Sequence, residues 1–152
     1  MTIRKATARD VQAVFDLTNA MAKQGLMLPR SKYRIVTMLA NFSVAETDTG
    51  EIAGAGALVP LWTDMCEIMS LSVGEKHRGR GVGKLLVQAL IEEGRRLEMP
   101  EVITLTYQVD FFRKLGFSVT DKDRFPRKMW RECLECPKLE ECDETAMYLK
   151  LR

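Results

Sequence analysis

The sequence is short of histidine, of long apolar runs and of unbalanced charge. It contains one histidine, His77, so a Ser-His-Asp or Cys-His catalytic set has no other imidazole to use. No apolar run approaches the length of a membrane span, and the N-terminus is polar where a signal peptide has its apolar core. The formal net charge is +2, with basic and acidic residues interspersed, which gives no nucleic-acid footprint. We therefore expect a cytoplasmic protein with neither nucleic acid nor membrane as partner.

Cysteine is also scarce, and three of the four cysteines gather in the tail as Cys133, Cys136 and Cys142. Cys-x-x-Cys is good zinc spacing, but a tetrahedral site needs a fourth ligand, and only Cys66 and His77 remain elsewhere. In a cytoplasmic protein such cysteines are thiols or metal ligands sooner than disulfides. We predict no metal site, and structural zinc, a redox pair and plain thiols near a substrate loop remain the alternatives for the tail.

Length and composition fit one folded unit. With 152 residues, 46% hydrophobic and 29% charged, the chain can bury a core as a single domain over residues 1–152. Hydrophobic periodicity and turn residues then give the expected elements. Strands are predicted over 2–7, 42–46, 52–59, 64–73, 101–106, 117–120 and 145–151, and helices over 11–24, 32–39, 81–97 and 110–115. Asp10 and Ser31 are the predicted N-caps of the first two helices.

The most informative stretch is residues 78–84, Arg-Gly-Arg-Gly-Val-Gly-Lys, between the strand ending at Val73 and the next helix. Gly81 and Gly83 lack Cβ atoms, so the free N–H groups of the helix's first turn can close on a diphosphate. The helix dipole is positive at this end. The side chains that add positive charge are Arg78, Arg80 and Lys84. The stretch therefore predicts a phosphate site, and the neighbouring His77 is expected to face solvent.

Two other phosphate motifs fit this stretch less well. A P-loop places Ser or Thr after its lysine, and here Leu85 follows Lys84. The Rossmann fingerprint has a longer last interval between glycines than Gly79, Gly81 and Gly83 provide. An ordinary glycine loop with surface arginines is the remaining alternative.

Arg-x-x-Gly-x-Gly directly after a strand resembles the coenzyme A signature of the GNAT N-acetyltransferases, and Phe111–Phe117 resembles that family's second recurrent block. The resemblance covers nearly the whole chain and implies the α/β (α+β) GNAT acyl-CoA N-acyltransferase fold. That fold has a mixed, mostly antiparallel sheet of about seven strands with about four helices. The resemblance also implies acetyl-CoA as co-substrate. The expected cofactor-binding residues are Leu71, Ser72, Val73, Arg78, Gly79, Arg80, Gly81, Val82, Gly83, Lys84 and Phe112.

In this family, the strand ending at Val73 and the strand from Val102 part and leave a cleft for the pantetheine arm. The arm pairs with backbone groups around Leu71 and Val73 like an added strand. A backbone N–H near Leu71 would then stabilise the acyl oxygen.

Acetyl transfer to an amine requires the neutral amine, yet an α-amino group has a pKa of about 8 and is mostly protonated at neutral pH. A carboxylate that takes this proton contributes about 10²–10⁴-fold in rate. Glutamates at the place of Glu67 act as the base in several GNAT enzymes, so the resemblance implies this role here. A structural salt bridge is the alternative for Glu67.

Protonation of the leaving thiolate is less well supported by the sequence. Many family members use a tyrosine where this chain has Phe112, so that acid is missing. Tyr107 is the candidate substitute. Packing with a tied hydroxyl is the alternative for Tyr107, and a coenzyme A thiolate can also leave without an acid.

Several blocks, with Gly25–Ser31 the most telling, resemble the acetyltransferase domain of bacterial N-acetylglutamate synthases, which act in arginine biosynthesis. This implies acetylation of the α-amine of L-glutamate. Arg30 is expected to hold a substrate carboxylate by two hydrogen bonds, assisted by Ser31. The alternative for Arg30 is a surface residue at a helix start.

Two departures from those synthases bear on the substrate. Longer synthases place an arginine just after the Leu-Thr pair, whereas this chain has Tyr107-Gln108. One cationic contact to the substrate is thus absent, and glutamine becomes an alternative substrate to glutamate. Gln108 is then a candidate substrate-binding residue. The chain also lacks the kinase-like domain that binds arginine in long synthases. Another small amine, a protein N-terminus and a non-catalytic acetyl-CoA sensor stay open. The resemblance makes a homodimer a candidate assembly, since family members commonly dimerise, but the oligomeric state stays open.

Overall fold

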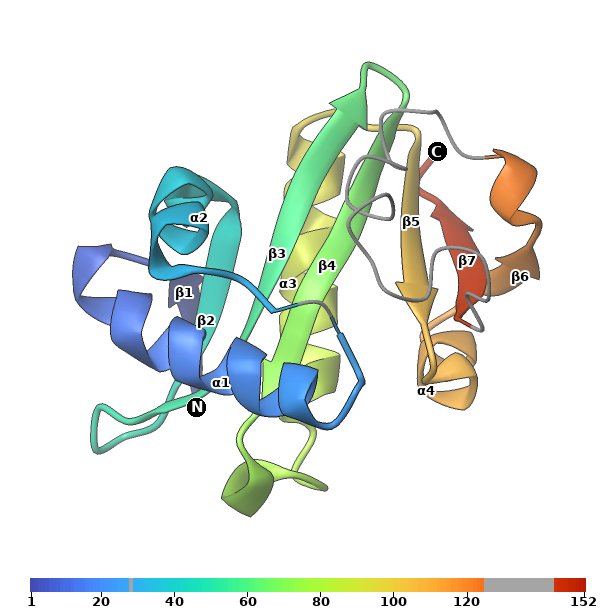
Figure 1. Cartoon of the computed structure of the whole chain (residues 1–152). Coiled ribbons are helices and arrows are strands. Elements are labelled where there is room, and N and C mark those ends of the chain that lie inside the picture. Colours follow the sequence, from blue (N-terminus) through green and yellow to red (C-terminus); the bar gives the residue numbers. More distant parts are fainter. Residues whose placement is uncertain (28, 125–143) are drawn as a thin grey trace. The chain divides into compact units, whose positions relative to one another are not determined.

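The computed structural model describes residues 1–27, 29–124 and 144–152, and orders them into seven strands and four α-helices (Figure 1). The strands are β1 (Thr2–Lys5), β2 (Phe42–Glu46), β3 (Ile52–Trp62), β4 (Met65–Val73), β5 (Glu101–Thr106), β6 (Ser118–Thr120) and β7 (Thr145–Lys150). The helices are α1 (Val11–Lys23), α2 (Lys32–Thr37), α3 (Val82–Arg96) and α4 (Val109–Lys114). Each predicted element is present: β2 and β5 have the predicted ends, and the ends of the others differ by at most three residues.

The strands form one mixed sheet in the order β1-β2-β3-β4-β5-β7-β6. Antiparallel ladders join β1 to β2, β2 to β3, β5 to β7 and β6 to β7. β4 and β5 are parallel, with Cys66 opposite Val102 and Glu67 opposite Ile103. The predicted mixed and mostly antiparallel sheet is therefore confirmed.

Two predicted element ends were wrong. β3 continues past its expected end at Val59 and through Pro60 to Trp62, because the φ that proline fixes is compatible with extended backbone. The second helix was expected to reach Leu39, but α2 ends at Thr37 and a 3₁₀ turn over Leu39–Asn41 follows.

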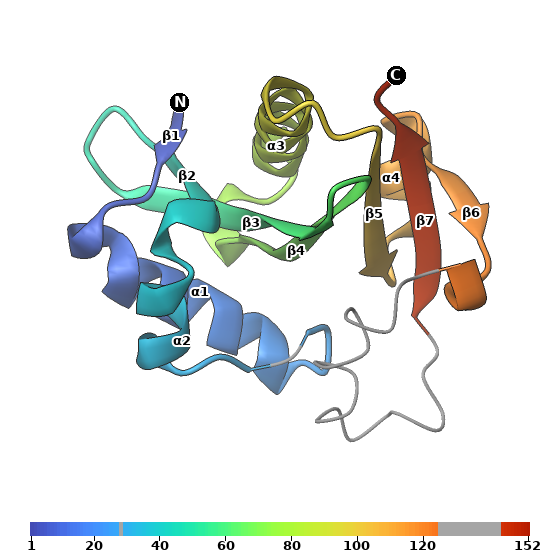
Figure 2. The ribbon, with the colours of Figure 1, turned by 90° about the horizontal axis from the view of Figure 1, so that it is seen from above.

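The chain forms two compact units. The first contains Met1–Val59 and Ile68–Glu93, and the second contains Pro60–Glu67 and the described part of Gly94–Arg152. Within the first unit, α1 and α2 cover one face of the strands and α3 covers the opposite face (Figure 2).

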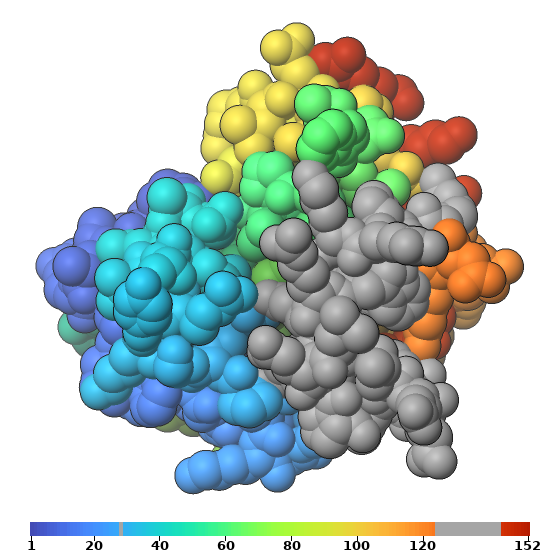
Figure 3. All heavy atoms as spheres, turned by 45° about the horizontal axis from the view of Figure 1, so that its top comes forward, coloured from blue at the N-terminus to red at the C-terminus, as the bar shows by residue number. Residues whose placement is uncertain are grey.

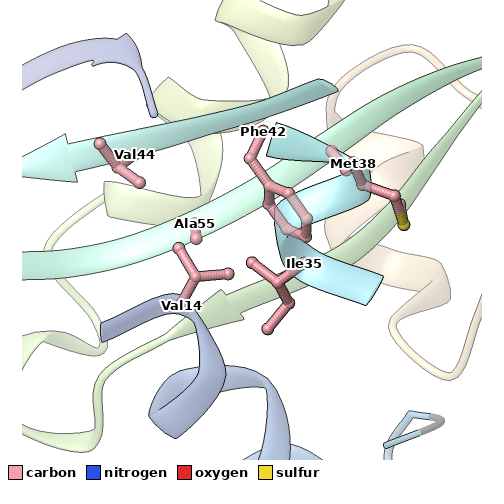
Figure 4. Close-up of a cluster of buried hydrophobic side chains, with 7 residues drawn as sticks. Val14, Ile35, Met38, Phe42, Val44 and Ala55 are labelled. Carbon is pink, nitrogen blue, oxygen red and sulfur yellow. The ribbon is translucent and has the colours of Figure 1, made fainter. Parts of the chain in front are cut away.

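Apolar side chains from α1, α2, β2 and β3 form a buried cluster in the first unit (Figure 4). Its members are Val14, Ile35, Met38, Phe42, Val44, Ala55 and Ala57. A second cluster lies where α3 meets the sheet and contains Ala45, Ala53, Val82 and Leu86. The amphipathic periodicity of these helices thus matches the faces that they bury.

Two glycines of β3 let α3 approach the sheet closely. A Cβ atom at Gly54 would lie 2.9 Å from the carbonyl oxygen of Ser72 and 3.1 Å from side-chain carbons of Val82 and Leu86. A Cβ atom at Gly56 would lie 3.1 Å from Leu71. Tight packing on the strand therefore accounts for these glycines.

Asp10 does not cap α1 as predicted. It occupies the N-cap position, but its side chain makes no capping hydrogen bond to the helix. The carboxylate instead accepts from Arg4 at 2.8 and 3.0 Å and from the Thr7 backbone N–H at 2.7 Å, while Arg4 also donates to Glu46 at 2.8 Å. The Arg4 hydrogen bond is the main cause that lowers the pKa of Asp10 to about 2. The charged side chain of Arg4 is thus a better partner for the Asp10 carboxylate than the backbone N–H groups of α1, because a hydrogen bond between two charged groups is stronger.

The second unit has a smaller described core. Met65, Ile103 and Ala146 are buried, with Leu61, Leu105 and Tyr148 packed around them. Phe112 of α4 meets Phe111 and Phe117 edge to face, with ring centroids 5.0 and 5.1 Å apart. Gly116 follows α4 in the left-handed region, at φ +98°, which confirms the predicted glycine end of this helix.

Candidate active site

Residues 78–84, which we call the glycine loop, join β4 to α3. Gly79 and Gly81 have φ values of +77° and +80°, in the left-handed region that favours glycine. A Cβ atom at either position would meet nothing within 4 Å, so the backbone conformation and not crowding requires glycine there. The sequence had singled out Gly81 and Gly83, but Gly83 already lies within α3. The positive φ values therefore identify Gly79 as the glycine that was undervalued.

The charged side chains of the glycine loop face outward. Arg78, Arg80 and Lys84 are all exposed. The Arg78 guanidinium donates to the carbonyl oxygen of Val73 at 3.4 Å and to the Met21 sulfur at 3.5 Å. The open N–H groups and dipole of a 15-residue helix lie next to three cationic side chains, and this arrangement suits a polyanion such as a diphosphate.

His77 is buried, so the expectation that it faces solvent was wrong. Only 8% of the residue is exposed, and it lies in a 3₁₀ turn over Glu75–His77. Its Nε2 atom is 3.5 Å from a carboxylate oxygen of Glu51, which also forms an ion pair with Lys76 at 2.6 Å. The hydrogen bond from Lys76 is the main cause that lowers the pKa of Glu51. These residues line a cavity of about 460 Å³ together with Leu17, Ile52, Gly74 and Glu75.

Two positions of β4 stand out. Glu67, the predicted base, is 8% exposed and lies opposite Ile103 of β5. Ser70 has a φ of +56°, which is uncommon for a residue other than glycine and interrupts the regular strand. Leu71, Ser72 and Val73 follow this irregularity, and Ser72 is buried at 1% exposure. The strand thus changes its backbone geometry just before the residues predicted to pair with the pantetheine arm.

Arg30, Asn19 and Ser70 meet in a second cluster, which we call the arginine junction. Arg30 lies in the connector between α1 and α2, the blue to cyan segments on the left of the space-filling view (Figure 3). Its Nε atom donates to the Ser70 hydroxyl at 2.7 Å, and its Nη2 and Nη1 atoms approach the sulfurs of Met69 at 3.3 Å and Met38 at 3.9 Å. Asn19 donates to the carbonyl oxygen of Arg30 at 3.1 Å. Arg30 is therefore a half-buried, oriented group and not the surface residue of the alternative interpretation.

Ser31 confirms its predicted role as a cap. Its hydroxyl accepts a hydrogen bond from the Arg34 backbone N–H at 3.1 Å, which fixes the start of α2 at Lys32, two residues after Arg30. The sequence did not point to Ser70 or Asn19. Nothing in the alternating pattern of β4 signalled a left-handed residue, and an asparagine inside a helix is an ordinary surface choice.

The remaining predicted residues lie at the end of β5 and on α4. Tyr107 follows β5 and is half-buried. Gln108 is exposed, and its backbone N–H donates to the Thr106 hydroxyl at 2.8 Å. Phe112 is 3% exposed within the aromatic cluster of α4. The functional roles of all three stay predictions.

The tail cysteines Cys133, Cys136 and Cys142 lie outside the described residues, as does the 125–130 stretch. Among residues 1–27, 29–124 and 144–152, no three His, Cys, Asp or Glu side chains are placed to hold a metal ion. Cys66 is a buried free thiol whose sulfur lies 3.6 Å from the carbonyl oxygen of Glu101. No α-helix in the described part of the chain is both long and apolar enough to traverse a bilayer.

Comparison with known proteins places the chain in a family. The profile described as the acetyltransferase (GNAT) family matches residues 17–117, which include both the glycine loop and the arginine junction. The chain belongs to the GNAT family. It is therefore an N-acetyltransferase, and the expected GNAT fold and enzyme class are confirmed.

Two relatives of this GNAT protein show how far the similarity extends. It is 38% identical to an uncharacterised N-acetyltransferase of Chlorobaculum tepidum over 149 residues, 95% of this chain and 93% of that protein. It is 31% identical to an amino-acid acetyltransferase of Mycobacterium tuberculosis over 118 residues, 76% of this chain and 67% of that protein. The amino-acid acetyltransferases of some other bacteria are longer, and the chain spans 29% of their length.

A solved structure extends the same comparison to three dimensions. The crystal structure of Rv2747 from Mycobacterium tuberculosis, in complex with CoA, covers the whole chain at 25% identity and a TM-score of 0.87. The GNAT fold described above thus matches a coenzyme-bound protein from end to end.

Proposed function

We propose that this acetyl-CoA-dependent N-acetyltransferase transfers acetyl directly to the α-amine of an amino acid, with L-glutamate as its principal substrate. The observation that carries the proposal is the arginine junction. It fixes a guanidinium beside Ser70 of β4, three residues after Glu67 on the same strand. The name of the 31% identical relative, amino-acid acetyltransferase, supports the same substrate class. The resemblance of Gly25–Ser31 to N-acetylglutamate synthases favours glutamate and a place in arginine biosynthesis.

The glycine loop is the proposed diphosphate site. The N–H groups at Gly81, Val82 and Gly83 would donate to the phosphate oxygens. Exposed positive charge would come from Arg78, Arg80 and Lys84. Leu71, Ser72 and Val73 would pair with the pantetheine arm through their backbone groups, and Phe112 would contribute apolar surface. The open space around Gly79 and Gly81 supports this assignment because it leaves the loop backbone accessible.

Glu67 is the proposed general base. Its carboxylate would take a proton from the substrate ammonium, directly or through a water molecule, and the neutral nitrogen would attack the thioester carbonyl carbon. The C–N bond forms, the oxygen takes negative charge near a backbone N–H close to Leu71, and the C–S bond then breaks while the nitrogen releases its second proton to solvent. Tyr107 would protonate the departing thiolate. In this scheme the proton lost by the amine and the proton gained by sulfur pass through different groups.

Arg30 is the proposed anchor of a substrate carboxylate. Ser31, the N-cap of α2, and Gln108, which follows β5, are the other proposed substrate-binding residues. The Nη atoms of Arg30 approach thioether sulfurs, which are weak acceptors. A carboxylate in place of those sulfurs would form stronger, charge-assisted hydrogen bonds. Glutamine is the second candidate substrate, because the exposed neutral side chain of Gln108 stands where longer synthases carry an arginine.

A thiol-release assay with acetyl-CoA over a panel of amino acids, polyamines and peptides tests the proposal. We expect the highest kcat/KM with glutamate and the next highest with glutamine. Turnover confined to polyamines or peptides would reject the amino-acid assignment, and binding of acetyl-CoA without any turnover would leave a sensor. A single domain over residues 1–152, a homodimer and a cytoplasmic location stay predictions.

Glu67→Gln is the sharpest test of the base. The amide cannot take a proton, so kcat should fall by about 10²–10⁴-fold, while the Kd of acetyl-CoA stays within about twofold. The acidic limb of the pH–rate profile should also disappear. An unchanged profile in the variant would remove Glu67 from the mechanism, and Glu75→Gln, an exposed glutamate after the same strand, serves as the matched control.

A further inference from the structure

We propose that Ser70 and Asn19 are positioning residues that aim the Arg30 guanidinium, so that its two terminal nitrogens meet the carboxylate of the acceptor amino acid. This inference rests on the proposed function, because it deepens the role given there to Arg30. It adds two residues and a geometry that the sequence did not suggest.

Ser70 holds the guanidinium by one particular nitrogen. The Nε–H of Arg30 donates to the Ser70 hydroxyl at 2.7 Å, a short hydrogen bond from a charged donor. A guanidinium can bind a carboxylate from the side, through Nε and one Nη, or from the end, through both Nη atoms. A carboxylate that binds end-on, through both Nη atoms, would leave the hydrogen bond from Nε to Ser70 intact, whereas one that binds from the side would compete with it. Ser70 thus selects the direction from which a carboxylate approaches.

The backbone of Ser70 places its hydroxyl for this contact. The φ of +56° turns the side chain out of the regular alternation of β4. A left-handed conformation is disfavoured for a residue with a Cβ atom, so surrounding contacts must hold Ser70 in it. Met69 precedes Ser70 on the strand and brings its sulfur to 3.3 Å from Nη2. The irregularity of the strand therefore brings two consecutive side chains to one guanidinium.

Asn19 fixes the other end of the same residue. Its side-chain amide donates to the carbonyl oxygen of Phe15, within α1, at 2.8 Å and to the carbonyl oxygen of Arg30 at 3.1 Å. The connector, which has no regular secondary structure at Arg30, is thereby tied to a rigid helix. Arg30 is held by its backbone through Asn19 and by its head group through Ser70. Such support on both sides leaves the free Arg30 side chain fewer rotamers, so less conformational entropy is lost when a carboxylate binds.

A double-mutant cycle tests the inference. Ser70→Gly keeps the left-handed backbone accessible and removes the short side chain that carries the hydroxyl, so the variant should fold. We expect the KM for the amino acid to rise about fivefold to tenfold, with the KM for acetyl-CoA unchanged within about twofold. Arg30→Ala should raise the amino-acid KM by about 30–100-fold. In the Arg30→Ala background, Ser70→Gly and Asn19→Ala should each have no further effect.

The outcomes separate this inference from the proposed function. If Ser70→Gly multiplies the effect of Arg30→Ala, Ser70 acts independently and the positioning role is overturned. If Arg30→Ala leaves the amino-acid KM unchanged, the proposed carboxylate anchor itself fails. A second readout needs no turnover: NMR should show a slowly exchanging Arg30 Nε–H in the wild type that exchanges rapidly in Ser70→Gly. Rapid exchange in the wild type would overturn the inference even if Arg30 binds the substrate.

Discussion

The glycine loop and the arginine junction lie in the same compact unit, yet they are built in different ways. The glycine loop offers backbone N–H groups, left-handed glycines and exposed charges, all of them within residues 78–84. The arginine junction offers one side chain, and three segments far apart in the sequence are needed to orient it. A binding site of the first kind is local, whereas one of the second kind depends on the tertiary structure.

This difference separates two tasks that an acetyltransferase must perform. A cofactor that is the same for every family member can be held by backbone geometry, which tolerates many side chains. An acceptor that differs between members must be selected by side chains, and their orientation costs additional supporting contacts. We therefore expect substitutions in the two regions to change different kinetic constants.

Gly81→Val should give the largest effect. A β-branched residue is strongly disfavoured at a φ of +80°, so the loop backbone must change and its N–H groups lose their common orientation. We expect the KM for acetyl-CoA to rise about 100-fold, or roughly 3 kcal/mol, and the amino-acid KM to stay within about twofold. Gly50→Val is the matched control, because Gly50 has a φ of +88° and equally open surroundings in the turn before β3. A joint rise of both KM values in Gly81→Val would contradict the separation.

The second prediction concerns the stability of the fold and uses Asp10, which belongs to neither the glycine loop nor the arginine junction. The pKa of Asp10 is about 2 in the folded protein, below the unfolded value of about 3.9, so the folded state binds fewer protons. Asp10 therefore contributes about 2–3 kcal/mol to the free energy of unfolding above pH 4, and this contribution is lost as the pH falls from about 4 to 2. Denaturation in urea should show a deficit for Asp10→Asn at pH 7 that disappears near pH 2.

The same variant sharpens the kinetic comparison. At pH 7 Asp10→Asn should be less stable but should keep both KM values, since neither binding region contains the residue. Altered KM values in folded Asp10→Asn would mean that general loss of stability, and not local geometry, explains the kinetic effects elsewhere.

Ser31→Ala should give the smallest effect. Loss of the hydrogen bond to the Arg34 N–H should lower the free energy of unfolding by about 1 kcal/mol, whereas Ser31→Gly should cost only a few tenths. If Ser31 also assists the carboxylate, both variants should raise the amino-acid KM by about twofold to fivefold and leave the acetyl-CoA KM unchanged. Equal amino-acid KM values in the wild type and both variants would confine Ser31 to capping.

The sequence predicted the local features of the molecule well. The end of β4, the glycine loop and the start of α3 were predicted from hydrophobic periodicity and from one short motif. The family resemblance that this motif suggested is confirmed. Ser31 was correctly assigned as a cap because its hydrogen bond reaches only three residues along the chain. Such features depend on neighbours in sequence, which pattern reasoning can see.

The features that were missed depend on tertiary contacts. Asp10 was expected to cap a helix, but Arg4, six residues away, is the stronger partner. His77 was expected at the surface, but the turn at Glu75 folds its ring inward beside Glu51. The left-handed backbone of Ser70 has no signature in the residue type, because serine is not one of the residues that favour positive φ.

Gly54 has a consequence for the cofactor that it never touches. It lies on β3, and an added methyl group would press on the Ser72 backbone and on the first turns of α3. Even an alanine would have to lift that helix away from the strands by a few tenths of an ångström, and the start of α3 carries the amides that follow the glycine loop. Under the proposed function, those amides bind the diphosphate, so a substitution at Gly54 should weaken coenzyme binding although Gly54 itself lies outside the proposed site.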